Sequence, residues 1–264
     1  MYPYRLFLDI DLYTVFLCLA VAGAIINFRF FAEKRKMSWK LSNLVVVSAA
    51  AAILFGYFSA VLFQALYNVE KLGKFVIDTS TGATFYGGLI GGAACFLLFY
   101  FVVGGFVFKD GEHVKGFFAV ADIASASIVI AHAFGRIGCL MAGCCHGGAT
   151  DKWYGIYMSA WGERVVPTQL YEAIFLFALY GFLVWRMLKR QSYGLPIYMA
   201  VYGAWRFAIE FVRKDYRGST LVDFLTPSQF IAILMIAGAC IVFLAQKAFI
   251  QKEKKLTEVK EYED

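Results

Sequence analysis

Seven apolar runs, each about as long as a helix that crosses a membrane, dominate this sequence. The hydrocarbon core of a bilayer is about 30 Å thick, and about 20 helical residues cross it. Because lipid offers no hydrogen bonds, a segment within it must satisfy its own backbone groups, as an α-helix does. The runs occupy residues 13–31, 41–66, 83–108, 117–134, 170–188, 195–211 and 230–249.

The composition agrees with this interpretation. Hydrophobic residues make up 61% of the chain and aromatic residues 18%, which is more than a soluble domain needs to fill its core. We predict an all-α, polytopic integral membrane protein of the cell (plasma or inner) membrane, with seven transmembrane helices. They form one domain over residues 1–250, and a charged tail follows over residues 251–264. The polar start of the chain and the lack of a cleavage pattern after the first run predict that no signal peptide is removed.

The distribution of lysine and arginine predicts the orientation, because cytoplasmic loops are enriched in positive charge. The basic residues that we assign to the cytoplasmic side are Lys34, Arg35, Lys36, Lys40, Lys109, Lys115, Lys189, Arg190, Lys247, Lys252, Lys254, Lys255 and Lys260. Those that we assign to the outer side are Lys71, Lys74, Lys152 and Arg164. We therefore expect the N-terminus outside and the C-terminus in the cytoplasm.

The segment HAFGRIGCLMAGCCHG, residues 132–147, places ionisable residues at the end of an apolar run. A charge at membrane depth costs about 2.5 to 3.5 kcal/mol on insertion scales, so Arg136 indicates a functional site with an anionic partner, such as a lipid phosphate. His132 lies four residues earlier and shares a helix face with Arg136. The alternative is that Arg136 only extends its side chain to the interface.

A second charged stripe occurs in WRFAIEFVR, where Arg206, Glu210 and Arg213 follow at helical spacing. Two arginines against one glutamate leave a net positive charge, which suits an anionic ligand. The alternative is an ion pair between helices that only stabilises packing. We expect Arg213 to be the more exposed arginine, close to the interface.

A third motif, VPTQLYE, leads into the fifth run. Pro167 suits the first turn of a helix, Gln169 and Glu172 share one face, and Tyr171 lies at interface depth. A helix start also offers free N–H groups to a phosphate. An ordinary interfacial helix start is the alternative interpretation.

Glycine is concentrated in FYGGLIGGAA, at the start of the third run. Small residues let helices approach closely, and they also leave room for a lipid headgroup. We predict helix packing for Gly91 and Gly92, whereas Gly87 and Gly88, beside Tyr86, are candidates to line a site.

The six cysteines fall into two groups. Cys18, Cys95 and Cys240 lie in apolar runs, where free cysteine behaves as a small hydrophobe, and we expect them to be buried and to serve packing. Cys139, Cys144 and Cys145, with His146, leave three interpretations open: a soft metal site, a disulfide, or apolar filling. The spacing C-x4-C-C-H matches no common zinc pattern, so we predict no metal.

Taken together, these motifs resemble the prolipoprotein diacylglyceryl transferase family over nearly the whole chain, in the same order and spacing. The family's glycine-arginine signature is similar to GRIG at 135–138, and its Pro-(Ser/Thr)-Gln-Leu-Tyr-Glu motif is similar to PTQLYE at 167–172. Its late Tyr-Gly-x-x-Arg segment is matched by Tyr202, Gly203, Arg206, Glu210, Phe211 and Arg213, and Gly56-Tyr57 falls where the family has an aromatic residue.

The resemblance implies seven spans with the N-terminus outside. It also implies transfer of a diacylglyceryl group from phosphatidylglycerol to the lipobox cysteine of a prolipoprotein signal peptide, with release of glycerol phosphate. Arg136 and Arg206 match the family's essential arginines. Two arginines can hold the leaving phosphate. The implied partners are these substrates and membrane lipids; we expect no cofactor and no nucleic acid.

This chain departs from the family where the acceptor is activated. Tyr86 stands where the family has histidine, and Cys139, Ala142, Gly143 and Cys144 replace its Asn…Asn-Gly-Glu positions. Thiol attack needs an ionised sulfur, and a tyrosine with a pKa near 10 is a poor proton acceptor at neutral pH. We therefore expect His132 to act as the base, with His146 or Glu172 behind it.

The departures leave two alternative functions: a paralogue that transfers a lipid-derived group to a non-protein acceptor, and a non-catalytic protein that binds or transports phospholipid. The residues that we expect in catalysis are Arg136, Arg206, His132, Tyr86 and Glu210. Those that we expect to bind substrate are Tyr57, Gly87, Gly88, Gly135, Gly138, Cys139, Cys144, Gln169, Tyr171, Glu172, Tyr202 and Arg213.

Overall fold

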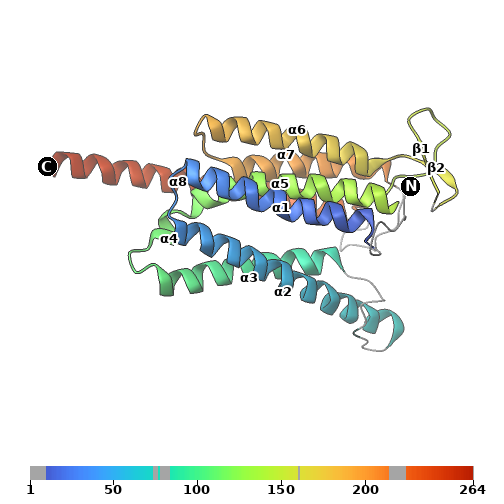
Figure 1. Ribbon diagram of the computed structural model, residues 1–264, viewed down its shortest axis with the longest axis horizontal. Helices are drawn as coiled ribbons and strands as arrows, with labels where there is room; N and C mark the ends of the chain where they lie inside the picture. The colour runs from blue at the N-terminus through green and yellow to red at the C-terminus, as the bar shows by residue number, and fades with distance from the viewer. Residues whose placement is uncertain (1–9, 74–76, 78–83, 160, 214–223, 264) are drawn as a thin grey trace. The chain divides into compact units, whose positions relative to one another are not determined.

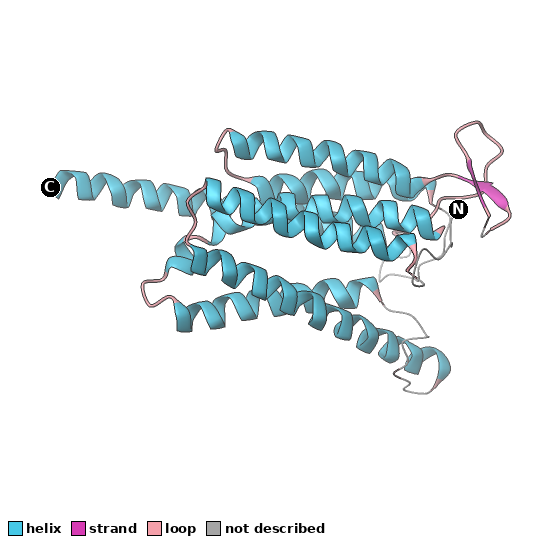
Figure 2. Cartoon of the chain, in the orientation of Figure 1, coloured by secondary structure: helices cyan, strands magenta, loops and turns pink. Residues whose placement is uncertain are grey.

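The computed structural model describes residues 10–73, 77, 84–159, 161–213 and 224–263. Its regular structure is almost entirely helical (Figures 1 and 2). The helices are α1 (Leu12–Lys34), α2 (Trp39–Leu72), α3 (Phe85–Val107), α4 (Glu112–Lys115), α5 (Phe117–Ala142), α6 (Thr168–Leu188), α7 (Gly194–Ile209), a 3-10 turn η3 (Glu210–Val212) and α8 (Pro227–Glu263). One antiparallel hairpin, β1 (Ile156–Met158) with β2 (Glu163–Val165), lies between α5 and α6. The all-α prediction is thus confirmed, with this small addition.

Six of the described helices are long and apolar enough to cross a membrane: α1, α2, α3, α5, α6 and α8. The protein is therefore a multi-pass membrane protein. The predicted run at 195–211 forms α7, which has only 16 residues because the chain tightens into η3 after Ile209. At 1.5 Å per residue such a helix is about 24 Å long, less than the hydrocarbon thickness. The count of seven spans and the orientation remain predictions.

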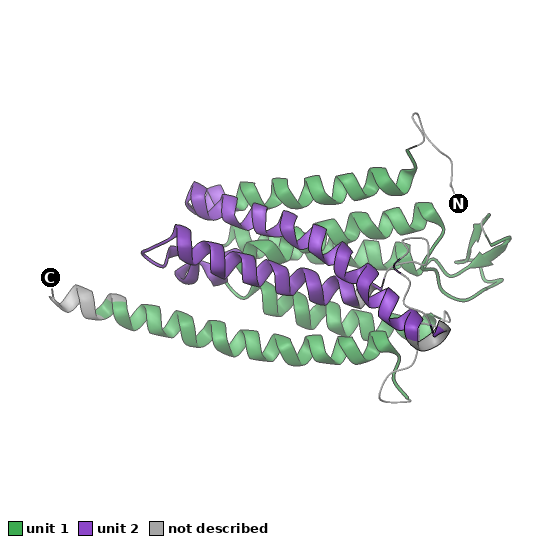
Figure 3. Ribbon diagram, turned by 90° about the horizontal axis from the view of Figure 1, so that it is seen from below, with its two compact units in different colours: residues 1–31, 121–264 green, residues 32–120 purple. Residues whose placement is uncertain are grey.

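The chain forms two compact units, and Figure 3 colours them separately. Unit 1 comprises residues 1–31 and 121–264, and unit 2 comprises residues 32–120. Unit 1 contains the segments singled out at 132–147, 167–172 and 202–213. Tyr57 and the segment from Tyr86 to Gly92 belong to unit 2.

Two buried polar bridges tie the helices of unit 1 together. Asn27 on α1 donates to Ser127 on α5 (2.9 Å) and accepts from Tyr180 on α6 (3.0 Å). In the second bridge the Asp122 carboxylate accepts from the backbone N–H of Gly194, at the start of α7 (2.7 Å), and from Gln246 on α8 (3.1 Å). Buried polar groups are stable only when they are hydrogen-bonded in this way. Both bridges hold α5 in place against its neighbours.

In unit 2 the glycines of α3 allow close packing against α2. A Cβ at Gly91 would lie 2.3 Å from the Ser59 Cβ, and one at Gly92 would lie 3.1 Å from the Ala52 carbonyl, which confirms the packing prediction for both. A Cβ at Gly87 would collide with Phe63. Gly87 and Gly88 therefore also serve this contact, and a role in lining a site remains a prediction.

One expectation about exposure is corrected by the structure. Cys18 and Cys240 are exposed and Cys95 is half-buried, so these cysteines are not packed in the protein core as predicted. An apolar residue in a span faces lipid as readily as protein, since lipid tails are equally apolar.

Helix α8 continues through the charged tail at 251–264 as far as Glu263.

Candidate active site

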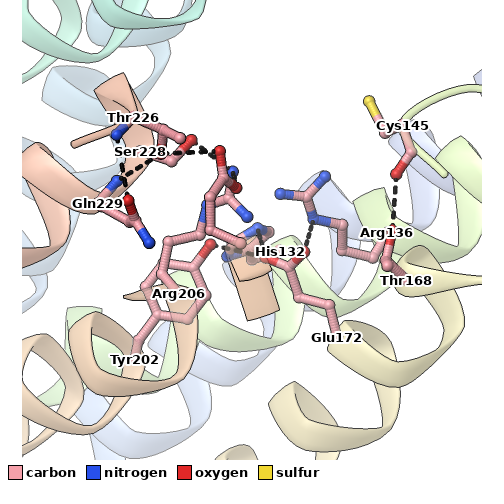
Figure 4. Close-up of polar contacts among 11 residues, drawn as sticks. His132, Arg136, Cys145, Thr168, Glu172, Tyr202, Arg206, Thr226, Ser228 and Gln229 are labelled. Atoms are coloured by element: carbon pink, nitrogen blue, oxygen red, sulfur yellow. Dashed lines mark hydrogen bonds and ion pairs between the residues drawn. The ribbon is translucent and has the colours of Figure 1, made fainter. Parts of the chain in front are cut away.

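The buried carboxylate of Glu172, near the start of α6, lies at the centre of the candidate site (Figure 4). Arg136 on α5 places its Nε 3.0 Å from Glu172 Oε2, and His132 Nε2 lies 3.7 Å from Oε1. Tyr202 on α7 donates its hydroxyl to Oε1 at 2.7 Å. Glu172 is fully buried, and a buried carboxylate needs such partners because burial disfavours its charge. Three helices are thus joined through one side chain.

A second cluster surrounds Arg206, near the end of α7 (Figure 4). Its Nη2 lies 3.0 Å from Glu210 Oε2, and the same nitrogen donates to Ser228 Oγ at 2.7 Å. Glu210 also accepts from the Thr226 hydroxyl at 3.0 Å. The stripe on which the sequence places Arg206 and Glu210 thus contains an ion pair between these two residues. Ser228 and Thr226 add contacts from the start of α8.

The site carries more positive than negative charge. Arg136 pairs with Glu172 and Arg206 with Glu210, and Arg213, three residues after Glu210, adds a third positive charge. Within the part of the chain that the structure describes, Arg206 Nη1 is buried and has no hydrogen-bond partner. A buried donor without a partner costs about 1 to 3 kcal/mol. An anion bound here would accept from this nitrogen and balance the extra charge.

The exposure of Arg213 differs from the prediction. It is 8% exposed, as is Arg206, so it is not the more exposed of the pair. The reason is the 3-10 turn η3, which ends the helix before Arg213 and gives that residue an extended backbone. Arg213 and Arg136 both lower the pKa of the Cys145 thiol electrostatically, after the larger effect of hydrogen bonds from Cys139 and Cys144. Arg213 and Arg136 therefore both contribute positive charge near Cys145.

The first residues of α6 hold the loop that follows α5. Thr168 donates its hydroxyl to the Cys145 carbonyl at 3.0 Å (Figure 4), and the Gln169 side chain donates to the Cys144 carbonyl. Both side chains are fully buried. The motif at 167–172 thus has two roles: Thr168 and Gln169 position the cysteine loop, and Glu172 pairs with Arg136.

The remaining predicted residues lie in several places. Gly138 allows α5 to approach Tyr13 on α1, whereas a Cβ at Gly135 would have no atom from another described part of the chain within 4 Å. Tyr171 makes a long contact of 3.5 Å to the Tyr154 carbonyl. His146 stacks edge-on against Trp161, so Glu172, rather than His146, is the group beside His132.

The predicted residues of unit 2 are placed on its own helices. Tyr57 lies on α2 and is exposed, and the backbone of Tyr86 forms the first turn of α3. The side chain of Tyr86 lies outside the described part of the structure, as do Lys74 and the side chains of Lys71 and Lys260.

The contribution of α8 was not predicted from the sequence. Thr226 and Gln229 form reciprocal hydrogen bonds, with the Gln229 N–H donating to Thr226 Oγ1 (3.2 Å) and the Thr226 N–H donating to Gln229 Oε1 (3.1 Å). This is a capping box, for which Thr-x-x-Gln before an apolar run is the sequence signal. The signal was present at 226–229, and the segment resembles the Pro-Thr-Gln start of α6.

Fold and site together define a multi-pass membrane protein with a buried, positively charged site built from α5, α6, α7 and the start of α8. The comparisons with known proteins agree. The family model described as prolipoprotein diacylglyceryl transferase matches residues 4–245, and the chain belongs to that family.

Named relatives are similar over most of their length. The phosphatidylglycerol–prolipoprotein diacylglyceryl transferase 2 of Clostridium perfringens is 32% identical, over 81% of this chain and 82% of its own. The corresponding transferase of Clostridium tetani is 30% identical, over 88% of this chain and 91% of its own. That of Dehalococcoides mccartyi is 28% identical, over 93% of this chain and 90% of its own.

Proposed function

We propose that this protein transfers a diacylglyceryl group from phosphatidylglycerol to the cysteine thiol of a prolipoprotein and releases glycerol phosphate. Membership of the family and the names of its relatives support this assignment. The observation that carries it is the pair of Arg136 and Arg206, of which Arg206 is buried and has an N–H without a partner among the described residues.

The arginines bind the phosphodiester of the lipid. This group carries one negative charge, and the departing glycerol phosphate gains a second as the carbon–oxygen bond breaks. Hydrogen-bond donors directed at the phosphate therefore stabilise the transition state more than the ground state, and this difference accelerates the reaction. Glu172 and Glu210 hold the two guanidinium groups in place.

The acceptor must lose its proton before it attacks. His132 takes the thiol proton, and Glu172, 3.7 Å from its Nε2, orients the ring. The sulfur then forms a bond to the glyceryl carbon while the bond from that carbon to the phosphate oxygen breaks. In this scheme the substrate-binding residues of unit 1 that are named above contact the two substrates. For Tyr86 we propose a contact with the lipid.

The substrates place the enzyme in the cell membrane, where phosphatidylglycerol is a lipid component. We assign the site to the outer side of that membrane, in line with the charge of the loops. The acceptor is the lipobox cysteine of a signal peptide that lies in the same bilayer. Seven spans, with α7 as the short one, complete this arrangement.

A transfer assay tests the function. The purified protein is mixed with phosphatidylglycerol labelled in its diacylglyceryl part and with a lipobox peptide, and a peptide with serine in place of the cysteine is the control. Label should appear on the cysteine peptide alone. Label on a lipid or glycan instead, or binding of the lipid without any transfer, would contradict the proposal.

A further inference from the structure

The structure gathers three sulfur atoms at the junction of α5 and the loop before α6. The sulfurs of Cys139, Cys144 and Cys145 all lie within 4.8 Å of one another, and all three thiols are half-buried and free. The proposed transfer reaction gives none of these thiols a bond-making or proton-transfer step.

The backbone of the loop brings these sulfurs together. Adjacent side chains of an extended chain point to opposite faces, which normally prevents neighbouring cysteines from sharing one partner. Here Gly143 and Cys145 both adopt the left-handed conformation, with φ of 71° and 61°. This conformation is uncommon for cysteine, and such strain persists where the surrounding structure enforces it, often at functional sites.

Neighbouring groups enforce the loop conformation. The Cys144 N–H donates to the Cys139 carbonyl at 3.1 Å, and the Cys144 thiol donates to the same oxygen at 3.7 Å. Thr168 and Gln169 bind the carbonyls of Cys145 and Cys144. The carbonyl oxygens are thereby occupied by hydrogen bonds, and the sulfurs are the groups left to bind a ligand.

We propose that Cys139, Cys144 and Cys145 bind one thiophilic metal ion, Zn²⁺ or Cu⁺, through three thiolates. With metal–sulfur distances of about 2.3 Å, sulfurs that share a tetrahedral ion lie about 3.8 Å apart, so the cluster needs to contract by at most about 1 Å. Thiolates are the ligands that select these two ions. A fourth position remains for solvent.

Positively charged side chains lie near the cluster. Three thiolates and one Zn²⁺ or Cu⁺ carry a net negative charge, and Arg136 and Arg213 are close enough to Cys145 to interact with it electrostatically. The same positive charge that suits a phosphate in the site therefore suits an anionic metal–thiolate centre beside it.

A disulfide is the competing outcome for these cysteines. Cys144 and Cys145 are adjacent, and their Cα atoms, about 3.8 Å apart, are closer than the 4.4 to 6.8 Å that a disulfide spans. A bond from Cys139 to either of them would leave the third thiol alone. A single metal ion, in contrast, can be bound by all three thiolates.

Metal content of the full-length protein, purified in detergent under reducing conditions, tests the proposal without turnover. Samples are incubated with Zn²⁺ or with Cu⁺, desalted and analysed for metal per chain by mass spectrometry. The protein should retain about one ion per chain after incubation with at least one of the two metals. Cys139→Ser, Cys144→Ser and Cys145→Ser should each reduce retention at least tenfold, whereas Cys240→Ser, an exposed cysteine on α8, should leave it unchanged.

Two further measurements keep the test decisive if a variant misfolds. Co²⁺ added to the unaltered protein should produce thiolate-to-cobalt charge-transfer absorption, and Zn²⁺ should remove it. The intact mass, measured without reductant, detects a disulfide as the loss of two hydrogens. Less than about a tenth of an ion per chain in both arms, or a disulfide that forms in place of metal binding, would overturn the proposal.

Discussion

At the residue scale, the arginines of the site are distinguished by how they are held. Arg136 pairs with a glutamate from another helix, whereas Arg206 pairs with a glutamate one turn along its own helix. Each therefore presents its guanidinium from a fixed position. A planar group held in this way can make two parallel hydrogen bonds to one phosphate, which an ammonium cannot.

We therefore expect Arg136→Lys and Arg206→Lys each to lower the rate of transfer although the charge is kept. Loss of one charge-assisted hydrogen bond is worth about 1.5 to 3 kcal/mol, or about 10- to 100-fold in rate. Arg186→Lys is the matched control, because Arg186 lies near the other end of α6, where it donates to the Ser192 carbonyl and contacts the Phe182 ring. Unaltered turnover in both lysine variants would refute the phosphate role.

The base assignment leads to a prediction about pH. His132→Gln should slow transfer most at pH 6 and should recover part of the rate towards pH 9, because a larger fraction of the acceptor thiol is ionised without help as the pH rises. Tyr86→Phe should leave the shape of the pH profile unchanged. The measurement is the initial transfer rate of each variant across this range. A fully active His132→Gln together with an inactive Tyr86→Phe would assign the role to the tyrosine.

At the scale of elements, two helix starts build the site. α6 begins with Thr168 and Gln169, which hold the cysteine loop, and α8 begins beside Thr226, which caps the helix and binds Glu210. The first N–H groups of a helix have no partner within it. Thr226 caps one of them at the start of α8, whereas Thr168 and Gln169 bind carbonyls of the loop before α6. The site thus depends on the beginnings of helices more than on their centres.

Thr226→Ala removes both the cap and the hydrogen bond to Glu210. Loss of such a cap costs about 1 kcal/mol, which corresponds to a fall of roughly 2 to 4 °C in the unfolding midpoint for a chain of this size. Transfer should fall as well, because Glu210 then holds Arg206 less firmly. Thr226→Ser, which keeps the hydroxyl, should restore both the midpoint in detergent and the rate; if it behaves like the alanine variant, the cap explanation is wrong.

The sequence predicts elements and local pairs better than it predicts contacts between helices. Apolar length was sufficient for six spans, and helical spacing placed Arg206 and Glu210 on one stripe, where they form an ion pair. The sequence left open whether Glu172 or His146 supports His132, because helix crossing angles decide which of the two comes within reach. Arg213 was misplaced because the periodic pattern continues past the turn at η3, where the helix ends.

At the scale of the whole molecule, the charge of the loops is the remaining guide to orientation. Membrane spans insert so that short loops rich in lysine and arginine stay in the cytoplasm. By this rule the exposed lysines of the tail lie inside, and the segment between α5 and α6 lies outside, with the hairpin and the cysteine loop. The outward position would also place the acceptor where exported proteins emerge.

Cysteine labelling on intact cells tests this orientation. In a background with the native cysteines replaced by serine, Lys152→Cys and Lys254→Cys are each treated with a membrane-impermeant maleimide; both positions are exposed. Lys152→Cys should react in intact cells, and Lys254→Cys only after the membrane is permeabilised, because the reagent cannot cross the bilayer. The same cells serve as their own control, since permeabilisation must expose both sites. Reaction of Lys254→Cys in intact cells, with Lys152→Cys protected, would reverse the orientation and place the site on the cytoplasmic side.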